Sequence, residues 1–155
     1  MSAEAFPAFF EQAVALYAAE SIAAGRFTES DALDRSRADN AKLLSEGIAT
    51  AGQFFFEVVA TDQNNPVGYL WLAAMPRGST KVAFVYQIII KPEHRRKGHA
   101  RAALLAAETF AVAQGLSGIA LHVFAHNVGA QALYRALGYH IASLNMLKPL
   151  GGGAA

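Results

Sequence analysis

The sequence predicts an α/β domain built on a mixed β-sheet, with the element order ααβββαβαβ. Apolar residues recur at helical spacing before residue 45 and again after residue 98. Between and after these stretches lie short runs rich in β-branched and aromatic residues, bounded by turn-forming residues, as expected of strands. A chain of 155 residues is the size of one ordinary domain. We therefore expect one domain over residues 1–150 and a flexible tail over residues 151–155.

Two helices are expected at the N-terminus. The first is indicated by residues at helical spacing that precede a glycine able to end a helix: Phe9, Ala13, Leu16, Tyr17 and Glu20, then Gly25. For the second helix, Thr28 and Asp31 resemble a capping box. Leucines continue this second helix, which is expected to close before Gly47.

Three strands should follow these helices. Residues 54–61 and 67–75 are apolar runs separated by turn residues at positions 62–66, which predicts a hairpin. A third strand is expected after the turn at residues 76–79. Every residue from Val82 to Ile90 except Gln87 is apolar or aromatic, which is typical of a strand buried on both faces.

The remaining elements alternate between helix and strand. A helix is expected over residues 98–114, with Gly115 as its stop, followed by a strand over residues 119–124. A short helix over residues 127–137 should end at Gly138, and a last strand is expected over residues 139–146.

Composition removes several classes of function. With 54% hydrophobic and only 16% charged residues, the chain has ample core material and is not disordered. The net charge of +1 argues against a broad nucleic-acid footprint. The absence of cysteine excludes disulfides, thiolate zinc sites and a cysteine nucleophile, and we expect no metal. No apolar run approaches the roughly 18 residues needed to span a bilayer, and no signal peptide is visible, so we expect a cytoplasmic protein without membrane partners.

A basic loop after the third strand is the feature that points most directly to a ligand. Lys91 and Pro92 end the strand, and a cluster of basic residues around one glycine follows: His94, Arg95, Arg96, Lys97, Gly98, His99 and Arg101. The N-terminus of a helix attracts anions by about 0.3–1 kcal/mol, and arginine binds phosphate bidentately. A phosphate ligand is therefore expected, although a solvated basic turn has the same composition. Neither a P-loop nor a G-x-G-x-x-G fingerprint is present.

Two motifs resemble those of the GNAT superfamily of acyl-CoA-dependent N-acyltransferases. The run from Arg95 to Ala100, RRKGHA, is similar to its R/Q-x-x-G-x-G/A motif. Downstream, the pattern N-x-x-A-x-x-L-Y-x-x-x-G-Y resembles the second signature of the superfamily, and it is formed by Asn127, Ala130, Leu133, Tyr134, Gly138 and Tyr139. The resemblance covers residues 54–147 and implies the fold of that superfamily.

The resemblance also implies roles for individual residues. Acetyl-CoA would donate the acetyl group to an amine by direct attack within a ternary complex. The backbone of Ile88, Ile89 and Ile90 would bind the pantetheine arm, and Asn127 would contact the same arm. The pyrophosphate would be held by the amides of Arg95, Arg96, Lys97, Gly98, His99, Ala100 and Arg101. Tyr134 would contact the thioester sulfur as general acid, a role that suits a phenol, while core packing is its alternative role.

The proton acceptor is where the sequence departs from the commoner pattern. Many GNAT relatives carry a carboxylate on the strand before the phosphate loop, but here Gln87 and Ile89 cannot accept a proton. His122 lies on the next strand, and period-two alternation turns it to the same side as Phe124 and His126. Some relatives that modify protein N-termini have a glutamate there, so His122 is a candidate general base. Its alternative is a histidine bonded to backbone.

If the protein supplies only a weak base, the acceptor amine should have a low pKa. At pH 7, deprotonating a lysine amine costs about 4.6 kcal/mol, whereas an α-amine costs about 1.1 kcal/mol. We therefore expect a primary amine of a small molecule, a peptide or a protein N-terminus, with a lean toward amines of low pKa. A catalytically silent acyl-CoA sensor of the same fold is the alternative. The apolar composition leaves a homodimer open.

Overall fold

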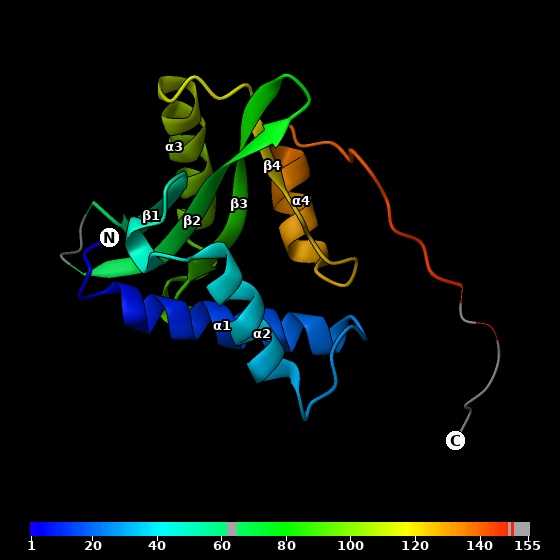
Figure 1. Cartoon of the computed structure of the whole chain (residues 1–155). Coiled ribbons are helices and arrows are strands. Elements are labelled where there is room, and N and C mark those ends of the chain that lie inside the picture. The colour runs from blue at the N-terminus through cyan, green and yellow to red at the C-terminus, as the bar shows by residue number, and fades with distance from the viewer. Residues whose placement is uncertain (62–64, 149, 151–155) are drawn as a thin grey trace.

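The computed structural model describes residues 1–61, 65–148 and 150. It is a four-stranded sheet with helices on both faces (Figure 1). The helices are α1 (Phe6–Ala23), α2 (Ala32–Leu43), α3 (His99–Ala113) and α4 (Val128–Ala136), joined by the short 3-10 helices η1 (Gly47–Ala49) and η2 (Pro92–His94). The strands are β1 (Gln53–Val59), β2 (Pro66–Arg77), β3 (Thr80–Ile90) and β4 (Ile119–Leu121).

The sheet is mixed, as the sequence predicts. Its strands lie in the order β1-β2-β3-β4. The first three pair antiparallel, and β4 joins β3 in parallel at three residue pairs, from Ala83↔Ile119 to Val85↔Leu121. The antiparallel strands need only short turns, whereas the parallel pair is connected through α3, the crossover that parallel strands require.

Alternation along the strands divides the core into two layers. On one face, Phe55, Tyr69 and Trp71 pack against Phe9 and Ala13 of α1. On the other face, the intervening residues Leu70, Leu72 and Val85 pack against Leu104 and Ala107 of α3, and α4 adds Leu133, Tyr134 and Leu137. Because successive strand residues point to opposite faces, the nearly continuous apolar pattern of β2 fills both layers.

An opening forms where β3 and β4 part. Their pairing stops at Val85 and Leu121, whereas β3 continues to Ile90. A register shift in the β2–β3 ladder between Trp71 and Leu72 leaves Tyr86 as an extra residue on β3, a β-bulge that bends the strand at this point. The edge of β3 beyond Val85 therefore faces a gap and carries no ladder from β4.

Two strand predictions need correction. The expected strand over residues 119–124 ends at Leu121, because its later residues leave β3 at the opening. The expected last strand over residues 139–146 does not form: these residues are irregular, and Leu144 and Met146 are 71% and 91% exposed. An apolar alternation becomes a strand only when a neighbouring ladder supplies backbone partners, and this segment has none within the described residues.

The other sequence-based boundaries agree within a few residues with the structure. The capping box expected at Thr28 and Asp31 forms only in part. The amide of Thr28 donates to Asp31 Oδ1 at 3.0 Å, but the N-cap of α2 is Asp31, and its side chain makes no capping hydrogen bond. The predicted turn at residues 62–66 falls partly, and the predicted flexible tail wholly, outside the described residues. Among the residues that are described, no helix combines the length and apolarity that a membrane crossing requires.

Candidate functional site

A cavity of about 340 Å³ lies at the opening between β3 and β4. One wall comes from α1, α2 and the loop between them, and the other comes from β2, β3, β4 and the segment leading into α4. Its lining consists of Leu16, Tyr17, Glu20, Arg26, Asp39, Asn40, Leu43, Trp71, Phe84, Val85, Tyr86, Gln87, Ile88, Leu121, His122, Val123, Phe124, Asn127 and Tyr134. The divergence of the two strands thus creates a pocket with mixed aromatic and polar walls.

Four residues singled out from the sequence line this one cavity: Ile88, His122, Asn127 and Tyr134. Ile89 and Ile90 do not line it. Ile89 packs into the layer beneath α1, as expected of the residue next to Ile88 on a strand. The carbonyl of Ile90 already accepts a hydrogen bond from Nε of Arg95, at 3.0 Å.

The basic loop ends at an open helix N-terminus. Gly98 precedes α3 with φ +85°, a conformation that favours glycine, and Arg96 adopts φ +62°. A Cβ on Gly98 would meet no atom within 4 Å, so the space in front of the helix is free. Within the described chain, no carboxylate forms an ion pair with Arg95, Arg96, Lys97 or Arg101. The amide of Arg95 donates to the carbonyl of Pro92 at 3.2 Å, whereas the amides of residues 96–101 have no partner within the described residues. An anion placed there would meet these amides and the positive charge of the loop.

Asn127 is the N-cap of α4. Its Oδ1 accepts a hydrogen bond from the amide of Ala130 at 3.2 Å. This contact fixes the side chain and the start of the helix. The Nδ2 group makes no hydrogen bond within the described part of the chain and remains available to a ligand in the cavity.

Tyr134 both packs and lines the cavity. Its ring belongs to the layer beneath α3 and lies 5.6 Å from the ring of Tyr139. Burial raises the pKa of the Tyr134 hydroxyl above its usual range. The group is therefore a neutral hydrogen-bond donor at pH 7.

His122 points to the side that the alternation predicts, although the residues after Leu121 have left the sheet. The rings of His122 and Phe124 are 5.0 Å apart and those of Phe124 and His126 are 5.6 Å apart. The imidazole of His122 is exposed and makes no hydrogen bond within the described residues. The structure thus brings His122 to the cavity without fixing its tautomer.

The sequence analysis missed a contact between Glu20 and His126. Oε2 of Glu20, on α1, lies 2.7 Å from Nε2 of His126, in the segment before α4. Glu20 lines the cavity, but His126 does not. A signal was present, since Glu20 falls one turn after Leu16 on the apolar face of the first helix, where a carboxylate is unusual.

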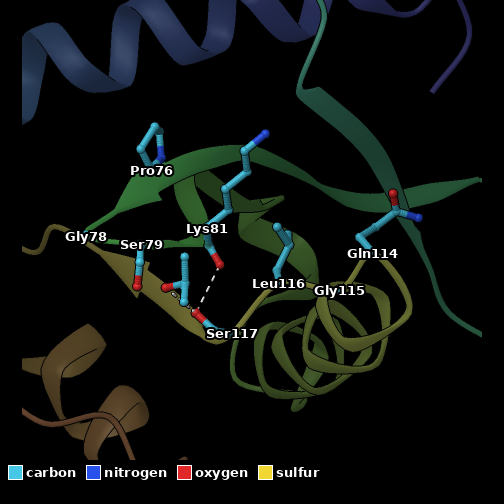
Figure 2. Close-up of a pocket in the computed structure, with 9 residues that line it drawn as sticks. Pro76, Gly78, Ser79, Lys81, Gln114, Gly115, Leu116 and Ser117 are labelled. Atoms are coloured by element: carbon cyan, nitrogen blue, oxygen red, sulfur yellow. Dashed lines mark hydrogen bonds between the residues drawn. The ribbon is translucent and has the colours of Figure 1, made fainter.

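A second hollow, of about 560 Å³, lies away from this site (Figure 2). It is an open hollow between the β2–β3 turn and the end of α3. Oγ of Ser117 contacts Thr80 Oγ1 at 3.0 Å and the carbonyl of Lys81 at 3.1 Å. No carboxylate or imidazole is among its lining residues, so it lacks the groups that acyl transfer needs.

No group of three or more His, Asp or Glu side chains in the described part of the chain is arranged to hold a metal ion. The titratable side chains that line the cavity include Glu20, His122 and Tyr134, which can transfer protons and form hydrogen bonds.

Comparison with known proteins agrees with this geometry. The model of a family described as the acetyltransferase (GNAT) family matches residues 13–139. The N-acetyltransferase YdgE of Bacillus subtilis is 34% identical over 150 residues, covering 97% of this chain and 95% of YdgE. The crystal structure of the acetyltransferase YycN of Bacillus subtilis superposes with a TM-score of 0.91 at 31% identity, covering 98% of this chain and 96% of that chain.

A more distant structure shares the fold. AAC(6')-Iy in complex with a bisubstrate analogue containing CoA is 18% identical, with a TM-score of 0.57 and coverage of 77% of this chain and 80% of that chain.

Proposed function

This chain belongs to the acetyltransferase (GNAT) family and is an acyl-CoA-dependent acetyltransferase, and from that premise we propose its donor, acceptor and site residues. Residues 1–150 act as a single N-acetyltransferase domain. The domain transfers an acetyl group from acetyl-CoA to a primary amine of a small molecule, a peptide or a protein N-terminus, by direct attack in a ternary complex. The observation that carries this proposal is the convergence of Ile88, His122, Asn127 and Tyr134 on one cavity.

The loop before α3 fits the pyrophosphate of acetyl-CoA. Four cations without carboxylate partners and the open space in front of Gly98 support this fit. We propose that the amides of residues 95–101 hold the pyrophosphate and that the backbone at Ile88–Ile90 and Nδ2 of Asn127 hold the pantetheine arm. Because the Ile90 carbonyl is occupied by Arg95, Ile88 is the strand residue best placed to accept hydrogen bonds from that arm. Acetyl-CoA supplies the acetyl group as a reactive thioester.

Tyr134 fits the role of general acid. Its raised pKa keeps the hydroxyl protonated at the pH of the reaction, and a neutral phenol can donate a proton to the departing thiolate. Its ring packs with Leu133 and Leu137. This packing holds the ring in place, which keeps the hydroxyl in a fixed position for proton transfer.

His122 fits the role of proton acceptor for the attacking amine. It lines the cavity with Tyr134, and an imidazole titrates near neutral pH. Since β3 supplies no carboxylate, an acceptor amine of low pKa, such as an α-amine, is favoured over a lysine side chain. The aromatic wall formed by Tyr17, Trp71 and Phe124 would accommodate an apolar group next to that amine.

Thiol release from acetyl-CoA in the presence of a panel of amines tests the proposal. The panel should include aliphatic amines, peptides with free N-termini and N-terminally blocked peptides that contain lysine. We expect turnover with free N-termini or other amines of low pKa, and the acetylated product should be confirmed by mass spectrometry. A protein that binds coenzyme A in a calorimetric titration yet turns over no amine would instead be an acyl-CoA sensor.

Replacing His122 by alanine tests its proposed role. The acidic limb of the rate-against-pH profile should move to higher pH, because the amine must then lose its proton to water. An unchanged profile would remove His122 from the mechanism.

We also propose that the protein is a homodimer. Apolar side chains in the segment after Tyr139 are exposed, and they are Ile141, Leu144, Met146, Leu147 and Leu150. They lie close together along the chain, and exposed apolar surface of this kind commonly marks an interface. Sedimentation equilibrium measures the mass directly, and a monomer at all concentrations would contradict this part of the proposal.

A further inference from the structure

Acetylation of an amine has to dispose of two protons. The acceptor enters as an ammonium ion, R–NH₃⁺, and leaves as an amide that keeps one hydrogen on nitrogen. One of the two lost protons is balanced by the proton that the thiolate gains, and the other is released to solvent. His122 and Tyr134 account for the first of these, so the site needs a second acceptor with a route to water.

Two carboxylates line the cavity, and they differ in how they are held. Asp39 lies on α2 with its side chain 45% exposed, and it pairs with the solvent-exposed Lys42 at 3.3 Å. The side chain of Glu20 is 28% exposed and is fixed by the 2.7 Å contact with His126. Oε1 of Glu20 makes no hydrogen bond within the described residues. Glu20 therefore has one oxygen that is anchored and one that is free to meet a ligand.

His126 anchors this carboxylate. Its side chain is 42% exposed, it lies outside the cavity lining, and its ring is stacked on Phe124 with an interplanar angle of 14°. Because an ionised carboxylate can only accept, Nε2 of His126 carries the hydrogen of the 2.7 Å contact and donates it to Oε2. A proton that Glu20 takes on Oε1 therefore leaves to solvent from Glu20 itself, whose side chain is 28% exposed. The contact spans the cleft, because it joins α1 to the segment before α4.

Other titratable or charged groups face the same cavity, and they are Tyr17, Arg26, Asp39, Tyr86, His122 and Tyr134. Arg26 does not neutralise Glu20, because its guanidinium donates to the hydroxyl of Tyr17 at 3.3 Å and forms no ion pair within the described residues. Among the described residues, Glu20 is thus paired with His126 alone, through Oε2, and Oε1 is left for a cationic acceptor.

We propose that Glu20 is a further catalytic residue, which binds the acceptor as an ammonium ion and takes its first proton, and that His126 is a positioning residue, whose Nε2–H holds Oε2 of this carboxylate. In this step an N–H bond of the ammonium breaks, an O–H bond forms at Oε1 of Glu20, and the electron pair stays on nitrogen. Glu20 then releases the proton to water, and Nε2 of His126 keeps its own proton throughout. The inference rests on the proposed acetyltransferase function and adds to it the residue that generates the free amine.

The test compares Glu20→Gln and His126→Asn with the wild-type protein on two acceptors of similar shape. These are 2-phenylethylamine and its 2,2-difluoro analogue, whose ammonium ion is much more acidic because fluorine withdraws electrons. Glu11→Gln is the matched control, because Glu11 is a carboxylate of α1 that pairs with Arg37 outside the cavity.

At pH 7, Glu20→Gln should lower kcat/KM for 2-phenylethylamine by about 100-fold, within the range of general base catalysis. The loss should shrink to a few-fold with the difluoro amine, and also with 2-phenylethylamine near pH 10, because both conditions supply free amine. His126→Asn should show the same pattern with a smaller loss, and Glu11→Gln should match the wild type.

Three outcomes overturn the inference: an equal loss on both amines, a loss that does not recover with pH, and no loss at all. If Glu20→Gln does not fold, His126→Asn with the same two amines decides the matter by the same criteria. If neither amine is acetylated, the variants are compared at pH 7 and near pH 10 on an amine of the panel that the wild-type protein does acetylate, with the same criteria. A wild-type protein that acetylates no amine of the panel contradicts the proposed function itself, which distinguishes that failure from failure of the Glu20 assignment.

Discussion

Tyr134 shows how a single residue serves two purposes at this site. Its ring packs beneath α3, and the residue also lines the cavity. Replacing Tyr134 by phenylalanine keeps the ring and removes only the proton donor. We expect kcat to fall by about 100-fold, as for loss of a general acid, with little change in the KM for acetyl-CoA. Steady-state kinetics at pH 7 measures both values.

Tyr139→Phe is the control for Tyr134→Phe. It removes the hydroxyl of a neighbouring tyrosine that does not line the cavity. That control should keep its kcat. Because burial raises the pKa of Tyr134, its ionisation should not limit the wild-type rate below about pH 10. Equal kcat values for Tyr134→Phe and the wild type would argue that Tyr134 is only a packing residue.

Tyr139 gives a prediction for stability at alkaline pH. Its hydroxyl is buried and has no hydrogen-bond partner among the described residues. Burial, with smaller contributions from Glu108 and Tyr134, raises its pKa to about 12. The unfolded chain ionises this phenol near pH 10, whereas the folded protein resists ionisation up to about pH 12. The contribution of neutral Tyr139 to the free energy of unfolding is therefore fully present below about pH 10. It is lost as the pH rises from there toward the pKa of the folded protein.

Tyr139→Phe should remove that alkaline loss. Urea unfolding at pH 8 and pH 11 measures it: the variant should lose less free energy of unfolding between the two pH values than the wild type does. At pH 8 the variant should be as stable as the wild type or slightly more stable, because it no longer buries an unsatisfied hydroxyl. An identical alkaline loss in both proteins would show that Tyr139 ionises freely in the fold.

Residue-level prediction worked where the chemistry depends on local periodicity. Period-two alternation predicted that His122, Phe124 and His126 lie on the same side of the chain. The ring of Phe124 lies close to the rings of both histidines. Glu20 was missed because its partner, His126, is 106 positions away along the chain. No local pattern encodes that distance, although a carboxylate on an apolar helical face gave a hint.

At the scale of elements, the β3–η2–α3 unit presents the basic loop to solvent. Gly98 adopts φ +85° and Gly115, just beyond the other end of the same helix, adopts φ +69°; neither would bring a new Cβ within 4 Å of another atom. Alanine at either position should therefore cost a similar backbone strain, about 1 kcal/mol. Only Gly98→Ala places a methyl group where the pyrophosphate is proposed to bind.

We expect Gly98→Ala to raise the Kd for coenzyme A by about 10-fold, whereas Gly115→Ala should leave it unchanged. Isothermal titration of coenzyme A measures the Kd, and thermal unfolding checks that both variants lose similar stability. If both variants bind coenzyme A like the wild type, the pyrophosphate does not lie at the helix N-terminus.

Most elements could be predicted because their signals are local. Glycines at helix ends and apolar periodicity predict the helices, and apolar runs, rich in β-branched residues only in β3, predict β2 and β3. The end of β4 at Leu121 and the bulge at Tyr86 could not be predicted, because both depend on the register between strands. The expected strand after Tyr139 did not form for the same reason, since a strand is defined by its partner. The cavity forms where β3 and β4 separate, and this separation depends on the pairing of the strands. The sequence motifs could therefore identify residues that line the cavity but could not predict its shape.

At the scale of the whole molecule, α1 and α3 lie on opposite faces of the sheet. Each helix packs on a different layer of the hydrophobic core. The α1 wall rests on Phe9, which is fully buried against the rings of Phe55, Tyr69 and Trp71. The α3 side rests in part on Phe110, which contacts the rings of Phe54 and Phe56. Glu20 belongs to the α1 wall, His122 and Tyr134 belong to the wall formed by β4, the segment after it and α4, and the proposed pyrophosphate loop lies at the start of α3.

Phe9→Leu and Phe110→Leu should therefore affect different substrates. Each shortens an aromatic side chain in one layer and should cost about 1–3 kcal/mol of stability. Because Glu20 lies on the same helix as Phe9, loosening that helix should weaken its contact with His126 and raise the KM for the amine, with the Kd for coenzyme A unchanged. Phe110 lies on α3, whose N-terminus is proposed to bind the pyrophosphate. Phe110→Leu should therefore raise the Kd for coenzyme A and leave the KM for the amine unchanged. Both constants should be measured at a temperature where both variants are folded. Parallel changes in both constants would mean that the two layers respond as one unit, and that the acceptor and donor sites are not mechanically separate.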